Sequence, residues 1–156
     1  AGLLQAHRFP PRELILEITE STVMRDVPSA IATMRALRAL GVRLSIDDFG
    51  TGHSSLAQLR SLPVDEIKID KSFVMRLDSS PDDTVIVRSA IEIGHNMGLV
   101  VIAEGVEQAG SLAILQGLQC DMGQGYFFSK PLPAEDFRRW HADFEANAPA
   151  RREATA

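Results

Sequence analysis

The sequence predicts an α/β fold built around a parallel β-sheet. Strand-like and helix-like segments alternate five times along the 156 residues, and such alternation is typical of parallel sheets with helical crossovers. The predicted strands are also apolar on both faces, as in a sheet that helices cover. These observations leave two architectures open, an open doubly wound sheet and a (β/α)8 barrel.

The first unit begins with a predicted strand at 14–19, where the apolar run LILEIT follows Pro10-Pro11. A helix is predicted over 27–40, because apolar side chains recur there at helical spacing. Gly41 directly follows this pattern and is the expected end of the helix.

The second unit pairs a strand at 43–47 (RLSID) with a short helix over 54–62. A serine is a good N-cap for this helix, and Pro63 prevents the helix from continuing. A third strand, EIKID, is predicted at 66–70.

The remaining units complete the alternation. A long helix is predicted over 82–98, followed by a fourth strand at 99–105 (LVVIAEG) and a helix over 108–118. A fifth, short strand is expected within 119–128, and a closing helix over 134–145.

Composition and charge exclude several classes of function. The net charge of −5 argues against a nucleic-acid polymer as partner, because such surfaces are normally basic. No apolar run approaches the ~20 residues of a membrane helix. The single cysteine, Cys120, suits a reducing compartment and indicates a cytoplasmic protein. No G-x-G-x-x-G or Walker loop follows a strand, which removes the usual nucleotide sites of open sheets.

Polar side chains gather at the carboxyl ends of the predicted strands. In parallel α/β folds these ends meet at one edge, where active sites assemble. The residues concerned are Glu17, Asp47, Asp48, Lys68, Asp70, Glu104 and Gln124.

A divalent cation would resolve the repulsion among these carboxylates. Burying one of them without a partner is costly. Glu17, Asp47, Asp48 and Glu104 offer hard oxygen ligands that suit Mg²⁺, Mn²⁺ or Ca²⁺, with no cysteine or histidine in the set to favour zinc. Gly50 and Gly52 allow a tight turn above this edge, and such a loop can move to cover a substrate.

Five ordered motifs resemble the EAL-domain cyclic di-GMP phosphodiesterases, over a match from about Pro10 to Trp140. They are E-I-T-E at 17–20, D-D-F-G-T-G-H-S-S-L at 47–56, I-K-I-D-K-S-F-V at 67–74, A-E-G-V-E at 103–107 and Q-G-Y-F-F-S-K-P-L at 124–132.

The resemblance implies a (β/α)8 TIM-type barrel, of which this chain holds about five C-terminal strand-helix units. Residues 1–145 would form the C-terminal part of the EAL domain, and 146–156 a disordered tail. Two features depart from the family. The E-A-L motif and the asparagine that follows it are absent and are expected upstream of Ala1. His53 replaces the usual tyrosine, which should change loop packing rather than chemistry.

The resemblance also implies hydrolysis of cyclic di-GMP to linear pGpG with two Mg²⁺ or Mn²⁺ ions. The first ion would bind Glu17, the second would bind Asp48 and Glu104, and Asp47 would bridge both. Lys68 would orient the attacking water and steady charge on the phosphate.

The other residues that the resemblance implicates have supporting roles. Glu20 would tether the D-D-F-G-T-G loop, and Glu107 would be a supporting carboxylate. Gln124 would hydrogen-bond in the water and phosphate region, and Asp70, Gln124 and Pro131 would contact the substrate.

Two classes of function stay open. One is the C-terminal part of a metal-dependent phosphodiesterase, and the other is a degenerate or truncated EAL module that binds cyclic di-GMP or a partner protein without catalysis. A Schiff-base enzyme using Lys68 is disfavoured, because the surrounding carboxylates keep that lysine protonated. A homodimer of the full domain and upstream sensor or GGDEF-type domains are compatible with either class.

Overall fold

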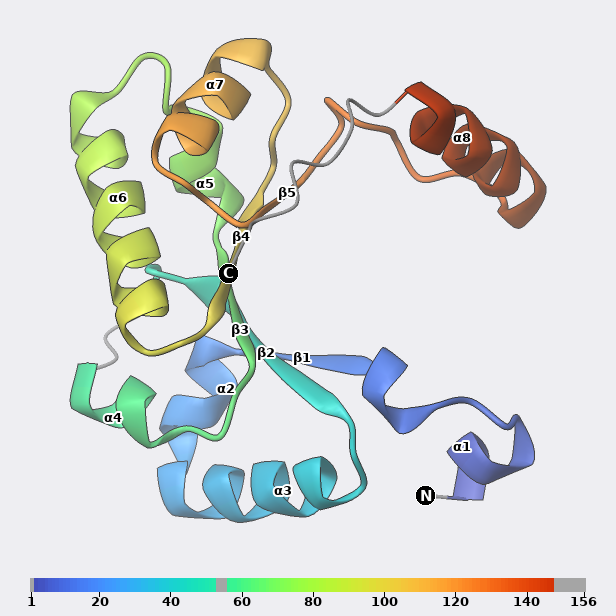
Figure 1. Cartoon of the computed structure of the whole chain (residues 1–156). Coiled ribbons are helices and arrows are strands. Elements are labelled where there is room, and N and C mark those ends of the chain that lie inside the picture. The colour runs from blue at the N-terminus through green and yellow to red at the C-terminus, as the bar shows by residue number, and fades with distance from the viewer. Residues whose placement is uncertain (1, 53–55, 148–156) are drawn as a thin grey trace, which may run out of the picture.

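A parallel five-stranded sheet organises the part of the chain that the structure describes. The computed structural model describes residues 2–52 and 56–147 (Figure 1). The strands are β1 (Ile15–Thr19), β2 (Arg43–Phe49), β3 (Glu66–Ile69), β4 (Val100–Glu104) and β5 (Met122–Gln124). Each strand pairs in parallel with the next.

The strand order decides between the two architectures that the sequence left open. The order is β1-β2-β3-β4-β5, the order of the sequence itself. A doubly wound sheet reverses its strand order at a switch point, whereas a barrel adds every strand in the same direction. The fold is therefore of the (β/α)8 type, represented by five consecutive strands.

Helices follow the strands as predicted, with additions. The predicted helices correspond to α3 (Val27–Ala39), α4 (Leu56–Ser61), α6 (Pro81–Asn96), α7 (Ala109–Gly117) and α8 (Ala134–Asn147). Short elements that the sequence analysis did not predict are α1 (Gly2–Ala6), the 3-10 turn Pro11–Glu13, α2 (Glu20–Arg25) and α5 (Lys71–Val74).

Local sequence explains where the longer helices begin and end. The Asp26 side chain accepts a hydrogen bond from the Ser29 amide at the start of α3. Ser80 caps α6 in the same way. Gly41 and Gly98 follow these two helices with φ values of +87° and +71°. This confirms the predicted stop at Gly41, and Gly98, the last residue of the predicted 82–98 helix, ends α6 in the same way.

The helices cover an apolar face of the sheet. That face carries side chains that are almost completely buried, among them Leu44, Ile46, Ile67, Ile69 and Val101. Helices α2, α3, α5 and α6 pack against the strands. In Figure 1, α8 lies apart from these helices, beyond β5.

The opposite face of the sheet is polar. Glu17, Ser45 and Glu66 are neighbours across β1, β2 and β3, and strand pleating puts Asp47 and Lys68 on this same face, two residues further along. The prediction that the strands are apolar on both faces is therefore wrong for this face. The polar face positions the site described below.

Some predictions concern residues that lie outside the described part of the chain. His53 and the predicted start of the second helix lie in residues 53–55, outside the described part. Helix α8 extends to Asn147, so the first two residues of the predicted tail, 146–147, are helical. The rest of that tail, residues 148–156, also lies outside the described part. Among the described residues, no helix has the length and apolar character needed to span a bilayer.

Candidate metal centre

Three carboxylates converge at the carboxyl end of the sheet. Asp47 and Asp48 come from β2 and Glu104 ends β4, and one carboxylate oxygen of each lies within 4.8 Å of those of the other two. An all-oxygen, negatively charged donor set fits a hard divalent cation such as Mg²⁺, Mn²⁺ or Ca²⁺. Three of the four predicted metal ligands are thus close enough to share an ion.

An irregularity in β2 explains how adjacent aspartates reach the same site. Side chains of neighbouring strand residues normally point to opposite faces. Here the register between β2 and β3 shifts between Ile46 and Phe49, and Asp48 has a φ of +57°. A bulge of this kind re-aims a side chain, so the carboxylate of Asp48 joins that of Asp47.

Lys68 lies among the carboxylates and connects the fourth predicted ligand, Glu17, to them. Its Nζ is 2.5 Å from Glu104 Oε1, 2.8 Å from Glu17 Oε1 and 3.8 Å from Asp47 Oδ1. The Lys68 side chain is buried, whereas that of Glu17 is half exposed. Lys68 therefore neutralises part of the negative charge of the cluster.

The electrostatic environment raises the pKa of Lys68 and that of Asp48. Burial alone would lower the pKa of Lys68, but hydrogen bonds to Glu104 and Glu17 outweigh it and raise that pKa to about 12. Desolvation raises the pKa of Asp48, and the nearby charges of Asp47 and Asp70 raise it further. Among these carboxylates Lys68 is consequently protonated at neutral pH and is a hydrogen-bond donor.

The loop after the two aspartates is held by Glu20, the first residue of α2. The buried side chain of Glu20 accepts a hydrogen bond from the Gly50 amide at 3.2 Å. A Cβ added to Gly52 would collide with the carboxylate of Glu20. Gly50 has a φ of +100°, which favours glycine strongly. The backbone therefore favours glycine at Gly50, and the close approach of the Glu20 carboxylate favours a small residue at Gly52.

The predicted substrate-binding and supporting residues are not part of this carboxylate cluster. Gln124 is the register neighbour of Glu104 on β5. Asp70 caps α5 by accepting a hydrogen bond from the Ser72 amide at 2.9 Å. Glu107 is exposed, and no hydrogen bond or ion pair joins it to the cluster within the described part of the chain.

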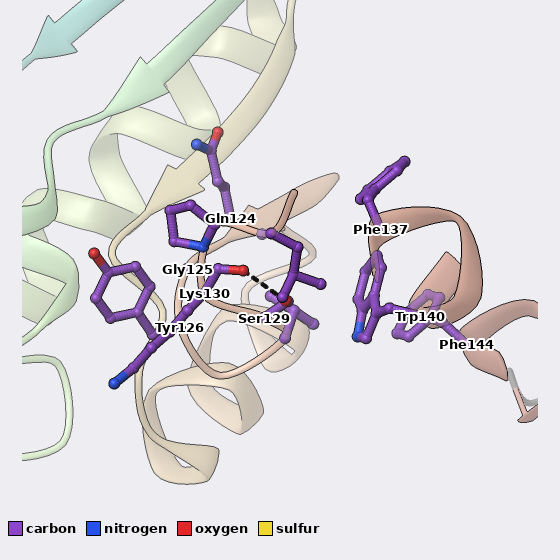
Figure 2. A pocket seen from close by; sticks show the side chains of 12 residues that line it. Gln124, Gly125, Tyr126, Ser129, Lys130, Phe137, Trp140 and Phe144 are labelled. Carbon is purple, nitrogen blue, oxygen red and sulfur yellow. Dashed lines mark hydrogen bonds between the residues drawn. The ribbon is translucent and has the colours of Figure 1, made fainter. Parts of the chain in front are cut away.

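Pro131 lines a groove that none of the three clustered carboxylates lines. The groove has a volume of about 530 Å³ and runs between the chain after β5 and the aromatic side chains of α8. Figure 2 shows Gln124, Tyr126 and Lys130 on one side and Phe137, Trp140 and Phe144 on the other. Only Gln124 and Pro131 of the predicted site residues line it.

The polar face also holds a second ionic pair, which the sequence did not predict. Arg43 donates a hydrogen bond to Glu66 at 2.9 Å, and Glu66 is buried. The polar alternation of Arg43, Ser45 and Asp47 in one strand and Glu66 and Lys68 in the next is the signal that could have revealed it. The polar face thus continues below the carboxylate cluster.

Comparison with known proteins identifies the family. The model of the EAL domain family matches residues 1–131. The cyclic di-GMP phosphodiesterase NbdA of Pseudomonas aeruginosa is 46% identical over 141 residues, which cover 88% of this chain. The bifunctional diguanylate cyclase/cyclic di-GMP phosphodiesterase MucR of the same species is 44% identical over 132 residues, 85% of this chain.

Solved structures agree with the sequence match. The PaMucR phosphodiesterase in complex with c-di-GMP superimposes with a TM-score of 0.84 at 43% identity, covering 87% of this chain and 55% of that one. Klebsiella pneumoniae BlrP1, solved with manganese and cyclic di-GMP, has a TM-score of 0.77 at 34% identity, covering 82% of this chain and 33% of that one.

The similarity covers most of this chain but a small part of the relatives. The chain spans 18% of the length of NbdA and 19% of that of MucR. The family match, the parallel sheet in sequential order and the carboxylates at its edge nevertheless agree. The chain belongs to the EAL domain family.

Proposed function

We propose that this chain is part of a metal-dependent phosphodiesterase that hydrolyses cyclic di-GMP to linear pGpG. The observation that carries the proposal is the convergence of Asp47, Asp48 and Glu104 around the cation Lys68. The names of NbdA and MucR and the cyclic di-GMP in the PaMucR structure support the choice of substrate.

The carboxylates would hold two Mg²⁺ or Mn²⁺ ions. Glu17 is assigned to the first ion and Asp48 and Glu104 to the second, with Asp47 between them. When bound, the ions supply Lewis-acid stabilisation of the attacking and leaving oxygens of the phosphodiester. The manganese in the BlrP1 structure supports a divalent metal as the cofactor.

Lys68 is proposed to orient the attacking water and to stabilise negative charge on the phosphate. Its pKa of about 12 keeps it protonated, so it serves as a hydrogen-bond donor and a fixed charge rather than as a base. The same protonation argues against a Schiff-base reaction, which requires a neutral amine.

The remaining site residues are proposed to position the reactants. Glu20 holds the loop after Asp48 through Gly50. Gln124, beside Glu104 in the sheet, is assigned to the water and phosphate, and Asp70 and Pro131 are assigned with it to substrate contacts. Glu107 is assigned a supporting carboxylate role in the loop that follows β4.

Metal removal tests the proposal directly. The full-length gene product is assayed for pGpG by chromatography, before and after exhaustive chelation and dialysis. We expect activity to disappear and to return with Mg²⁺ or Mn²⁺, because the donor set consists of hard oxygen ligands. Full activity after chelation would contradict the proposal, and binding of cyclic di-GMP without turnover would instead support a non-catalytic EAL module.

A further inference from the structure

Helix α5 lies between the two loops that carry the acidic residues. Gly50 follows Asp48, and a Cβ added to it would lie 3.2 Å from the Phe73 ring of α5. Gly105 follows Glu104 directly, and a Cβ added there would lie 2.5 Å from Lys71 Cβ, also on α5. Helix α5 therefore contacts the backbone of both loops.

These close approaches leave the loops little freedom relative to α5. Gly105 has a φ of +70°, so its backbone turns where Lys71 packs against it. Asp70, the residue before α5, accepts hydrogen bonds from the Ser72 amide and hydroxyl and lies against Asp48. The sheet joins β2 to β4 through β3, and α5 adds a second connection between the loops that follow Asp48 and Glu104.

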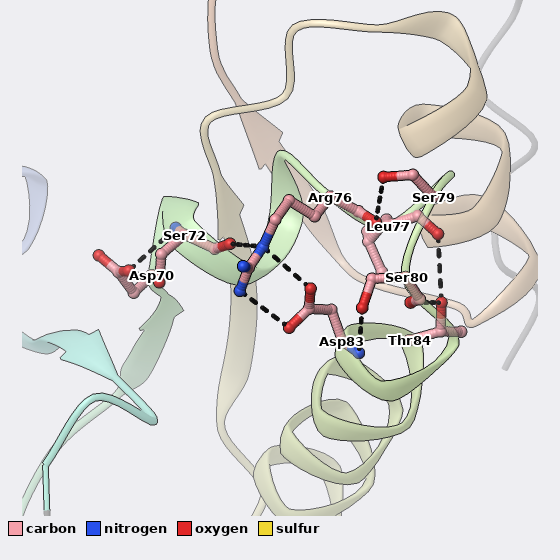
Figure 3. A network of polar contacts seen from close by, with 8 residues as sticks. All are labelled: Asp70, Ser72, Arg76, Leu77, Ser79, Ser80, Asp83 and Thr84. Atoms are coloured by element: carbon pink, nitrogen blue, oxygen red, sulfur yellow. Dashed lines mark hydrogen bonds and ion pairs between the residues drawn. The ribbon is translucent and has the colours of Figure 1, made fainter.

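Helix α5 is too short to maintain its own position. It contains four residues, and isolated helices of that length are unstable in water. The fully buried Val74 packs α5 into the core, and Arg76 adds a polar anchor, because its Nε donates a hydrogen bond to the Ser72 carbonyl at 3.2 Å. Figure 3 shows the Arg76 guanidinium extending from this carbonyl to Asp83 at the start of α6.

The pair of Arg76 and Asp83 joins α5 to the longest helix in the described part of the chain. Arg76 Nε is 3.0 Å from Asp83 Oδ2, and Arg76 Nη2 is 3.3 Å from Asp83 Oδ1. The Asp83 side chain is 7% exposed. Arginine is suited to this two-point contact, which fixes geometry as well as charge. Helix α6 is itself held by buried side chains such as Val87 and Ile91.

We propose that Arg76 and Asp83 are positioning residues for the metal centre. By fixing α5 against α6, they hold the Asp48 and Glu104 carboxylates at the separation needed to bind a divalent ion. The inference rests on the proposed function, in which these carboxylates bind metal. Neither residue contacts the cluster, so their effect is transmitted through Ser72, α5 and the two glycines.

The test measures metal affinity separately from turnover. The full-length gene product and its R76Q, D83N and R76Q/D83N variants are depleted of metal and titrated with Mn²⁺ in a calorimeter. Thermal melts, kcat and KM are measured in parallel. The matched control is R88Q, because Arg88 is an exposed arginine on the same helix and has no ion pair within the described residues.

We expect each single variant to bind Mn²⁺ about tenfold more weakly, the loss typical of residues that orient metal ligands from outside the coordination shell. The double variant should lose no more than either single variant, because the two residues act as one pair. A further variant, R76K, should bind Mn²⁺ more tightly than R76Q but more weakly than the wild type, because lysine keeps the charge but not the two-point contact. R88Q should bind like the wild type.

The double variant separates positioning from stability. It removes both charges, so no carboxylate is left buried without a partner, and its melting temperature should exceed that of R76Q. If its Mn²⁺ affinity then returns to the wild-type value, or if R76Q and D83N both bind Mn²⁺ like R88Q, the proposal is overturned. Should the wild type bind Mn²⁺ but fail to hydrolyse cyclic di-GMP, the proposed function fails while the calorimetry still decides this inference.

Discussion

At the scale of single residues, backbone geometry rather than residue identity creates the site. The motif D-D-F-G predicts two adjacent carboxylates, but a regular strand would send them to opposite faces. The positive φ of Asp48 and the register shift beside it bring both to one side. The sequence indicates the ligand types at this position, whereas the bulge that makes them usable is visible only in the structure.

The ion pairs of Lys68 are a second residue-scale feature that the sequence predicts in part. Pairing of Lys68 with Asp47 or Glu104 follows from their placement at neighbouring strand ends. The pair with Glu17 crosses from β3 to β1. It depends on the order of the strands, which the alternation of elements alone does not determine.

The cysteine provides a residue-scale prediction about reactivity. Burial raises the pKa of Cys120 to about 11, and the thiolate is the reactive form. Two pKa units correspond to an about 100-fold smaller thiolate fraction. Because a thiolate of higher pKa is also the stronger nucleophile, about half of this effect on a logarithmic scale is offset. We therefore expect iodoacetamide at pH 8 to alkylate the folded protein about tenfold more slowly than the urea-unfolded protein, as followed by mass spectrometry. Equal rates in the two states would contradict the assigned burial.

At the scale of elements, the sequence predicts the five described strands, the long helices and α4, but it misses the short helices α1, α2 and α5. Helices α3 and α6 have clear apolar periodicity and end at glycines, so their existence follows from the pattern. Helices α2 and α5 contain six and four residues, less than two turns each, and periodicity has no meaning over so short a span. Tertiary contacts stabilise them, such as that between Phe73 and Gly50.

The close packing of α6 on the sheet gives a prediction at this scale. A Cβ on Gly94 would overlap the Val101 side chain and lie 3.1 Å from Ile67 Cδ1. We expect Gly94→Ala to destabilise the protein by about 1–3 kcal/mol, the usual cost of overpacking a core, in urea denaturation. Gly117→Ala is the control, because no other part of the described chain comes within 4 Å of its new Cβ. A Gly94→Ala variant as stable as this control would show that α6 packs less tightly than described.

At the scale of the whole molecule, the sheet leaves both outer edges and an aromatic groove open. Within the described residues, β1 and β5 each have a strand neighbour on one side only. Phe137 and Phe144 of α8 are 49% and 48% exposed beside the groove. Exposed strand edges and apolar patches of this kind promote association.

Residues 1–156 expressed alone should therefore associate and lack phosphodiesterase activity. The open edges and the groove favour self-association. Association through these surfaces can displace the catalytic groups, and a displacement of about 1 Å can lower the rate about 100-fold. Light scattering gives the mass, and a pGpG assay with excess Mn²⁺ gives the activity. A monodisperse monomer with the turnover of a full EAL domain would refute this prediction.

The central claim is that the carboxylates at the sheet edge form the metal centre of a cyclic di-GMP phosphodiesterase, and Asp47→Asn tests it most directly. The full-length variant, the wild type and an Asp82→Asn control at an exposed position are compared for pGpG production across a Mn²⁺ titration, with thermal melts alongside. Because Asp47 is assigned to both ions, we predict that Asp47→Asn abolishes turnover at every Mn²⁺ concentration. The melting temperature of the metal-free variant should equal that of the metal-free wild type, and Asp82→Asn should behave as wild type in both measurements. Turnover by Asp47→Asn within about tenfold of the wild type, a loss of only ~1.4 kcal/mol in transition-state stabilisation, would contradict the claim.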